Sequence, residues 1–242
     1  MPDPFPTPSP SGVLSRRRSL GLLLGSGSSL VLGGCALDGW SGTVGAATQP
    51  LNERVEALLQ RRGTVPEFDR RQVQPEALLI NSFNGTPRIE PASYRLAVAG
   101  AVQRPLRLDL AALAALPQRE CVIRHVCVEG WAAIVAWSGP RLADVLALAG
   151  PSPLAGYLAI RSADQYFETW DLASALHPQT LLATHMNGAP LAAGNGAPVR
   201  LASPIKLGYK QSKWVTGLEL MSRLGERRGT WEDQGYEWFA GL

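Results

Sequence analysis

The sequence predicts an α+β fold with a mixed sheet for residues 78–242. Segments with the alternation typical of strands outnumber those with helical spacing, and the two kinds are interspersed without a regular βαβ rhythm. The dipeptide Asn187-Gly188 lies between two apolar runs and predicts a tight turn, because both residues tolerate positive φ. A doubly wound parallel sheet is therefore not expected.

Composition indicates a folded globular protein. The 242 residues suffice for one domain of ordinary size, and 45% of them are hydrophobic while 18% are charged. The formal net charge is +3, but residues 1–34 contain Arg16, Arg17, Arg18 and Asp3, so the remainder holds 20 basic and 19 acidic residues. The basic excess belongs largely to the leader, and no nucleic-acid partner is expected.

Residues 1–34 have the pattern of an export signal. Ser15–Leu20 resembles a twin-arginine motif, and the apolar run Leu20–Leu32 is shorter and richer in glycine than the ~20 apolar residues of a membrane-spanning helix. Leu32–Cys35 resembles a lipoprotein cleavage box that would leave Cys35 lipidated, with a plain cleaved signal peptide as the alternative. Both interpretations place the protein outside the cytoplasm, in the periplasm.

Residues 35–77 are expected to connect this leader to the domain. Asp38–Pro50 is rich in Gly, Ser, Thr and Ala, as linkers are, and Leu51, Val55, Leu58 and Leu59 follow at the spacing of an amphipathic helix. In the domain, strands are expected at 78–83, 94–98, 157–161, 166–170, 181–186, 199–202 and 214–221, and helices at 110–116 and 141–149. The density of Trp, Gly and Pro over 131–140 indicates irregular backbone.

Two cysteines remain beyond the leader, and they are expected to differ in role. On an extended strand, at ~3.3 Å per residue, the Cα atoms of Cys121 and Cys127 lie far beyond the ~7 Å limit for a disulfide, and no turn residue intervenes. Cys121 is therefore predicted to be a buried, apolar-like residue, and Cys127, at the end of the strand, a functional thiol.

Three separated motifs point to a known family. Arg124–Trp131, Asn195–Arg200 and Gly208–Lys210 resemble, in order, motifs of the sulfite-oxidase superfamily of molybdopterin enzymes, nearest to exported bacterial relatives of the protein-methionine-sulfoxide reductase catalytic subunit. The likeness runs from about Leu78 to the C-terminus. The sequence ends at Leu242 without the immunoglobulin-like dimerisation domain of sulfite oxidases, so none is expected.

The resemblance implies a molybdenum-molybdopterin cofactor with Cys127 as the protein ligand of the metal, because a thiolate donates strongly to a high-valent metal. It also implies cofactor contacts by Asn81, Asn84, Gly85, Ser162, Asn195, Arg200, Gly208, Tyr209 and Lys210. Amide groups suit the pterin edge, and an arginine fork or a lysine suits a phosphate. The relatives carry an aromatic and an acidic residue at the positions of Asn84 and Gly85, and a threonine at Ser162.

Other residues near these motifs have weaker signals. Glu129 either orders the cysteine loop as an acceptor or is an ordinary loop acid. Alternation places Arg124 and His125 on opposite faces of their strand. Trp131 and Trp137 are expected in the core around the loop. His185 is a further candidate for the cavity, with a structural position as the alternative.

The predicted activity is two-electron oxygen-atom transfer by an exported oxidoreductase. The resemblance implies reduction of a small-molecule or protein-bound S-oxide or N-oxide, and a membrane haem or quinol-linked partner is expected because no C-x-x-C-H haem motif is present. Sulfite is disfavoured, since Val128–Trp131 supplies Glu129 and no base. A sulfite-type dehydrogenase and a non-catalytic cofactor-binding protein are the alternatives. A hydrolase fits less well without a G-x-S-x-G elbow.

Overall fold

A computed structural model describes Leu51, Val55 and residues 63–242, so the predictions for the leader, Cys35 and the linker lie outside the described residues. Leu51 and Val55 are helical, as expected. Among the described residues, no helix has the length and apolar character needed to cross a bilayer.

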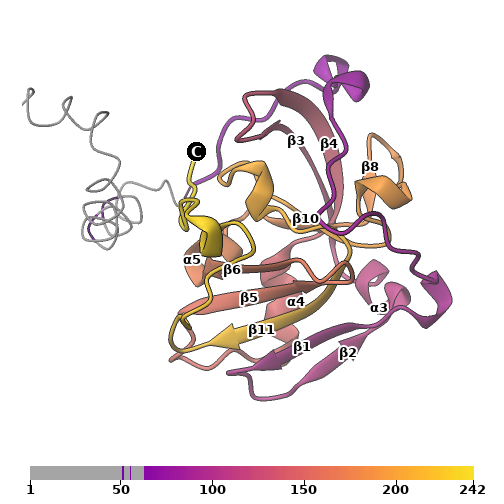
Figure 1. Ribbon diagram of the computed structural model, residues 1–242. Coiled ribbons are helices and arrows are strands. Elements are labelled where there is room, and N and C mark those ends of the chain that lie inside the picture. Colours follow the sequence, from indigo (N-terminus) through magenta and orange to yellow (C-terminus); the bar gives the residue numbers. More distant parts are fainter. Residues whose placement is uncertain (1–50, 52–54, 56–62) are drawn as a thin grey trace, which may run out of the picture. The chain divides into compact units, whose positions relative to one another are not determined.

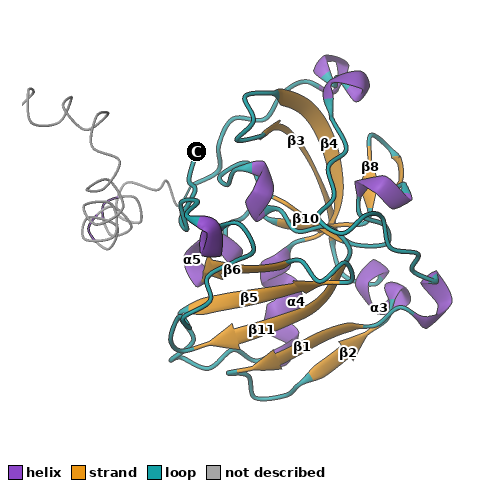
Figure 2. Ribbon diagram, in the orientation of Figure 1, coloured by secondary structure: helices purple, strands orange, loops and turns teal. Residues whose placement is uncertain are grey.

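Strands dominate the described part of the chain, and the helices are short (Figure 2). The strands are β1 Leu96–Gly100, β2 Leu106–Leu108, β3 Gln118–Val126, β4 Ala132–Pro140, β5 Tyr157–Ser162, β6 Phe167–Asp171, β7 Leu181–Ala183, β8 His185–Met186, β9 Ala189–Pro190, β10 Arg200–Ala202 and β11 Val215–Met221. The α-helices are α3 Leu110–Ala114, α4 Leu142–Ala149 and α5 Leu172–Ala175. Short 3₁₀ helices span Arg70–Gln72, Pro75–Ala77, Pro91–Ser93, Ala193–Asn195, Gly208–Lys210 and Glu232–Gln234.

The largest sheet is mixed, which confirms the predicted fold class. Its five strands lie in the order β2-β1-β11-β5-β6, and they form the lower half of the domain in Figure 1. Strands β1 and β11, far apart in sequence, pair in parallel, whereas the other neighbours pair antiparallel. A parallel pair needs a long crossover, and here the chain from Ala101 to Trp214, including β3 and β4, connects the two strands.

The core of this sheet follows from two sequence patterns. The alternating Tyr94, Leu96 and Val98 are all buried, and Leu142, Val145, Leu146 and Ala149 form the buried stripe of α4 that packs in the same cluster. Helix α4 ends at Gly150, whose φ of 66° is the left-handed conformation that glycine adopts at little cost. Both elements occur where they are predicted.

The second layer is a long hairpin that rises above this sheet in Figure 1. Strand β3 pairs with β4 over nine positions, from Gln118 opposite Pro140 to Val126 opposite Ala132. The expectation of irregular backbone over 131–140 is therefore wrong. Gly139 fits a strand because a Cβ there would lie 2.1 Å from the Leu182 carbonyl oxygen, so the glycine permits close packing of β4 against β7.

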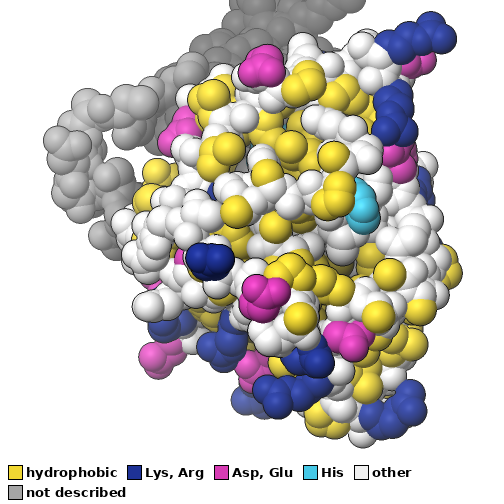
Figure 3. Space-filling model, turned by 90° about the vertical axis from the view of Figure 1, so that its right-hand side faces the viewer, with side chains coloured by type: hydrophobic (Ala, Val, Ile, Leu, Met, Phe, Trp, Pro, Cys, Tyr) yellow, Lys and Arg dark blue, Asp and Glu magenta, His cyan; other side chains and the backbone are white. Residues whose placement is uncertain are grey.

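Strand β4 also pairs with β8, which turns into β9 through Asn187 and Gly188. The φ values of these two residues are 53° and 87°, so the tight turn is confirmed. On the face shown in Figure 3, apolar side chains cover much of the middle, and basic and acidic side chains are interspersed around it. That face carries no large field of one sign.

The predicted strand at 78–83 is absent. Residues 78–82 are extended without a strand partner, and Leu79 and Ile80 are more than half exposed. This segment is held by side chains instead: the Lys213 ammonium donates to the Asn81 carbonyl. An apolar run that is exposed at a cavity has no facing strand to pair with, and periodicity alone does not reveal this.

Candidate functional site

Five segments distant in sequence meet around one cavity of about 400 Å³. They are residues 78–83, the end of β3 with the β3–β4 loop, Asp164 with Tyr166, residues 194–214, and the tail residues Trp231 and Tyr236. Of the predicted site residues, those lining this cavity are Cys127, Asn81, Asn195, Arg200, Gly208 and Tyr209. Those not lining it are Asn84, Gly85, Ser162 and Lys210.

Cys127 lies in the turn that closes the β3–β4 hairpin. Its N–H donates to the Trp131 carbonyl at 2.9 Å, and its carbonyl accepts from the Gly130 N–H at 3.2 Å. These bonds fix the backbone of the thiol-bearing residue at the cavity wall. Burial raises the pKa of the Cys127 thiol, and the nearby Glu129 carboxylate raises it too, so a cation is needed to favour the thiolate.

Glu129 connects this loop to the segment at 78–83. One carboxylate oxygen, Oε2, accepts from Asn81 Nδ2 at 2.9 Å and from Trp131 Nε1 at 3.0 Å, and it lies 3.6 Å from Cys127 Sγ. The hydrogen bond from Trp131 is the main reason that the pKa of Glu129 is lowered. The contacts favour the interpretation that Glu129 orders the loop.

Two cations face the cavity. Arg200 is buried and its guanidinium donates only to carbonyls, of Leu201 at 3.1 Å, Asn195 at 3.1 Å and Gln211 at 3.4 Å. Among the described residues it forms no ion pair, and burial lowers its pKa to about 9. Burial, and then the Arg200 charge, lower the pKa of Lys213 to about 8. An anion between these side chains would relieve the cost of burying both charges.

Two buried polar atoms at the cavity also lack a partner within the described residues, Ser212 Oγ and His125 Nδ1. Burial lowers the pKa of His125 to about 3, so its ring is neutral and lies beside Trp131, with ring centroids 5.9 Å apart. Arg124 is exposed on the opposite face, over the Phe68 ring, which confirms the predicted alternation. Polar atoms left open at a cavity indicate a polar ligand.

Gly208 permits the approach of the cation-bearing segment to the cysteine loop. A Cβ at this position would lie 2.9 Å from His125 Nε2 and 3.2 Å from the Val126 carbonyl oxygen. Any larger residue would push the two walls of the cavity apart. This close approach explains why position 208 is a glycine, although it is remote in sequence from Cys127.

The structure corrects the role expected for Lys210. Its ammonium is fully buried away from the cavity and forms ion pairs with Glu168 and Glu232, so its charge is already neutralised. The cation that reaches the cavity from this segment is Lys213, three residues later. A signal was present in the sequence, because all three lysines of the chain lie within residues 206–213.

Three further predicted contacts also lie outside the cavity. Asn84 uses its amide to donate to the Asp164 carbonyl at 3.0 Å, and Gly85 follows it in the loop. Ser162 lines a neighbouring hollow with Tyr166, and its buried Oγ has no partner among the described residues. The Ser162 hydroxyl could therefore bind a ligand in this neighbouring hollow, but it does not line the cavity beside Cys127.

Among the aromatic and histidine candidates, the prediction was wrong for Trp131. Trp137 is fully buried, as expected, but Trp131 is half-buried and lines the cavity. His185 is exposed and bonded to Thr184, away from the cavity. Cys121 is buried and free, as predicted, and burial raises the pKa of its thiol to about 11.

The protein groups around the cavity suit a metal ion whose ligands come mostly from a bound cofactor rather than from side chains. Within the described residues, no group of three or more His, Cys, Asp and Glu side chains could hold a metal ion, whereas one thiol and two cations face one cavity. A metal bound at Cys127 must therefore be held mainly by non-protein donors, and the cations suit an anionic group on the same ligand.

Comparisons with known proteins agree with this donor set. Residues 83–231, more than half of the chain, match the model of the oxidoreductase molybdopterin binding domain. A putative protein-methionine-sulfoxide reductase subunit of Azospira oryzae is 40% identical over 177 residues, which cover 70% of this chain and 67% of that protein. The protein-methionine-sulfoxide reductase catalytic subunit of Gluconobacter oxydans is 30% identical, over 94% of this chain and 77% of its own.

Coverage is lower for other relatives. The catalytic subunit of Xanthomonas campestris is 30% identical over 64% of this chain, and the match spans 56% of its own length. Among solved structures, a chain of the sulfane dehydrogenase from Paracoccus pantotrophus has a TM-score of 0.57 and 21% identity, covering 63% of this chain and 43% of that chain. This last likeness shows a shared fold.

Proposed function

This chain belongs to the family of oxidoreductase molybdopterin-binding domains, and from that premise we propose that it reduces neutral S-oxides or N-oxides by two-electron oxygen-atom transfer. The family makes it an enzyme with a molybdenum-molybdopterin cofactor, and the alternative of a non-catalytic binding protein is set aside. The overall change is one oxide, two electrons and two protons converted to the reduced compound and water.

The observation that supports this proposal best is the placement of Cys127, Arg200 and Lys213 around one cavity. Cys127 would hold the metal through its sulfur, and the two cations would hold the phosphate of the cofactor. Bound molybdenum supplies the two-electron oxygen chemistry. Arg200 suits the phosphate best because its donors already lie at the cavity floor and no carboxylate among the described residues competes for them.

A neutral substrate fits the open side of this cavity. The charged group beside the Cys127 sulfur is the Glu129 carboxylate, whereas Arg200 and Lys213 are the groups suited to the cofactor's own anion. An anion such as sulfite would meet a like charge at the reacting side, but an S-oxide would not. The relatives named as protein-methionine-sulfoxide reductases support the same substrate chemistry.

Export and electron supply form part of the proposal. The twin-arginine pattern at Arg16 and Arg17 and the cleavage box at Cys35 support delivery to the periplasm, with a lipid anchor at Cys35. A membrane haem or quinol-linked protein would supply electrons, since the sequence carries no C-x-x-C-H motif.

Two measurements test this function. Protein purified from a host that makes the cofactor should contain about one molybdenum per chain by elemental analysis, in line with a single cysteine ligand. With a reduced dye as donor, turnover of dimethyl sulfoxide or trimethylamine N-oxide should exceed sulfite oxidation measured with a matched acceptor. Folded protein without molybdenum, or efficient sulfite oxidation without oxide reduction, would contradict the proposal.

A further inference from the structure

Five aromatic side chains form a continuous wall on one side of the cavity, which we call the aromatic wall: Phe83, Tyr166, Trp231, Tyr236 and Tyr209. Phe83 meets Tyr166 and Trp231 edge to face, with ring centroids 6.0 and 6.3 Å apart. Tyr236 continues the wall, 5.4 Å from Trp231 and 5.6 Å from Tyr209. These distances are those of favourable aromatic pairs, so the five rings form one surface.

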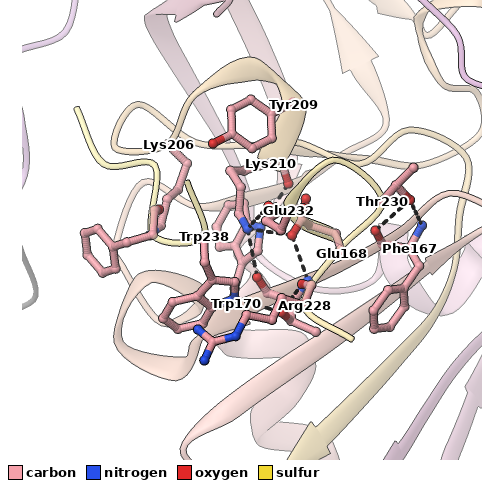
Figure 4. Close-up of polar contacts among 12 residues, drawn as sticks. Phe167, Glu168, Trp170, Lys206, Tyr209, Lys210, Arg228, Thr230, Glu232 and Trp238 are labelled. Atoms are coloured by element: carbon pink, nitrogen blue, oxygen red, sulfur yellow. Dashed lines mark hydrogen bonds and ion pairs between the residues drawn. The ribbon is translucent and has the colours of Figure 1, made fainter. Parts of the chain in front are cut away.

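Three residues close in sequence to members of this wall, Glu168, Lys210 and Glu232, form a buried ion cluster, which Figure 4 shows. The Lys210 ammonium is 2.5 Å from Glu168 Oε1, pairs with Glu232 Oε1 as well, and donates to the Thr169 carbonyl at 3.0 Å. All three charged side chains are essentially inaccessible to solvent. Groups so deeply buried keep one geometry, because moving any of them would expose an unpaired charge to a low dielectric.

The cluster and the wall are coupled through the backbone. Each charged residue lies one or two positions along the chain from a wall residue: Glu168 from Tyr166, Lys210 from Tyr209, and Glu232 from Trp231. The Tyr166 hydroxyl also donates to the Tyr209 carbonyl at 2.7 Å. The ion cluster therefore ties together three segments that are remote in sequence, and each of these segments contributes a ring to the wall.

The charge balance of the cluster supports a fixed arrangement. Burial raises the pKa of Glu168 well above its ordinary range; Lys210 opposes this shift, and the neighbouring Glu232 adds to it. The positions of the three groups therefore depend on one another, because each of the two glutamates is within ion-pair distance of the same ammonium. Gly229 leaves room for this arrangement, since a Cβ there would lie 1.9 Å from Glu232 Oε2 and 2.8 Å from Glu168 Oε1.

We propose that the Glu168–Lys210–Glu232 cluster is a positioning device that holds the aromatic wall as the substrate-selecting face of the cavity, favouring oxides with an aryl or similarly large apolar substituent. This inference rests on the proposed oxide reduction. The wall reaches the surface, because Phe83 and Tyr236 are 43% and 40% exposed, so an apolar substituent can stack there while its polar oxygen points toward Cys127.

The wall is tested first, with the holoenzyme. The measured quantity is the KM for methyl phenyl sulfoxide relative to that for dimethyl sulfoxide. The Phe83→Ala and Tyr236→Ala variants should raise this ratio about fivefold to tenfold, the loss expected for one stacked aromatic pair, with the effect in KM rather than kcat. The matched control is Leu176→Ala, because Leu176 is an apolar residue as exposed as Phe83, at 43%, and lies outside the cavity.

The cluster is tested next through the same ratio. Lys210→Met should raise the ratio as the wall variants do, whereas the conservative Glu168→Gln, which keeps the size of the side chain and an oxygen that can accept from Lys210, should retain most of the selectivity. If Lys210→Met fails to accumulate, the neutral triple variant Lys210→Met/Glu168→Gln/Glu232→Gln replaces it. The wild-type ratio in a folded Lys210→Met protein, in the triple variant that replaces it, or in a wall variant would overturn the inference.

A binding measurement separates this inference from the proposed function. Methyl phenyl sulfone and dimethyl sulfone serve as probes, with affinity followed by tryptophan fluorescence. The wild type should prefer the aryl probe, and the Phe83→Ala and Lys210→Met variants should lose that preference. Preference without sulfoxide turnover would contradict the proposed reaction alone, whereas turnover without preference would contradict the wall alone.

Discussion

At the scale of single residues, the chemistry of the cavity depends on one thiol and two incompletely paired cations. Cys127 differs from Cys121 only by its place at the end of β3, yet the first lines the cavity and the second is sealed in the core. Arg200 and Lys213 are held by carbonyls, which do not cancel their charge. Such residues are poised for an anionic ligand.

The two cysteines should therefore respond differently to the same substitution. Cys127→Ser should lose nearly all oxide reduction and the molybdenum–thiolate absorption, because a hydroxyl is a much poorer ligand for the metal. Cys121→Ser should keep activity and lose about 1–3 kcal/mol of stability, because its hydroxyl is buried in an apolar cluster. Spectra, turnover and denaturant unfolding measure these effects, and equal loss of activity in both variants would show that the ligand is misassigned.

Arg200 should govern cofactor retention. Arg200→Met removes the charge-assisted bonds expected at the phosphate, each ~1.5–3 kcal/mol, so molybdenum per chain should fall at least tenfold after gel filtration. Arg124→Met is the control, since Arg124 is an exposed arginine of β3 that lies over the Phe68 ring and does not line the cavity. Full molybdenum occupancy in the Arg200 variant would remove this residue from the cofactor site.

The lowered pKa of Lys213 predicts that the free energy of unfolding of the cofactor-free protein depends on pH. Its folded pKa of about 8 lies below the ordinary lysine value of 10.5, so between these values the unfolded chain binds more protons. The free energy of unfolding should therefore rise with pH from about 8 toward 10.5, apart from opposing groups such as Cys121. The difference between wild type and Lys213→Met isolates the effect, and curves that stay parallel over this range would contradict it.

At the scale of elements, the β3–β4 hairpin is the support of the thiol. Its nine-position register fixes the turn from Cys127 to Trp131, and close packing on β7 fixes the hairpin in turn. The turn projects beyond the paired strands toward residues 78–83, so the hairpin behaves as a rigid arm carrying the metal ligand.

Gly139 is the position where that packing is most exacting. Gly139→Ala places a Cβ against the Leu182 backbone, which cannot rotate away, so stability should fall by about 1–3 kcal/mol. Gly156→Ala is the matched control, because a Cβ there meets nothing within 4 Å. Thermal unfolding measures both, and a Gly139 variant as stable as the control would show that β4 and β7 are less tightly packed.

At the scale of the whole molecule, the cavity exists only because distant segments converge. Residues 78–83, the hairpin turn, Asp164 with Tyr166, residues 194–214 and the tail residues Trp231 and Tyr236 each supply one part of its lining.

Export is tested at the leader. Changing both Arg16 and Arg17 to Lys should retain the protein inside the cell, because the twin-arginine route reads the arginine pair as an address. Fractionation followed by immunoblotting measures this, with Arg61→Lys/Arg62→Lys as a charge-matched control outside the signal. Unchanged export of the Arg16/Arg17 variant would indicate the general secretion route.

The sequence alone determined the features that depend on short-range periodicity. The alternation at Tyr94–Val98 and the stripe of α4 are set by which faces must be buried, and the Asn187-Gly188 turn by local backbone freedom. The strand before Cys127 followed from its apolar run. Each of these patterns involves residues that are only a few positions apart, so the sequence alone contains the information needed to predict the element.

Tertiary structure decided which side chains reach the cavity. Lys210 and Lys213 lie three residues apart, but of these two only Lys213 lines the cavity, because the Lys210 ammonium forms buried ion pairs with Glu168 and Glu232. Likewise, β4 formed despite its Trp, Gly and Pro content because β3 pairs with it along its full length. The ion-pair partners of Lys210 are 22 and 42 residues away, and the strand partners of β4 extend from Ala132 opposite Val126 to Pro140 opposite Gln118. The free energy of a buried ion pair or a strand ladder depends on such partners rather than on the immediate neighbours in sequence.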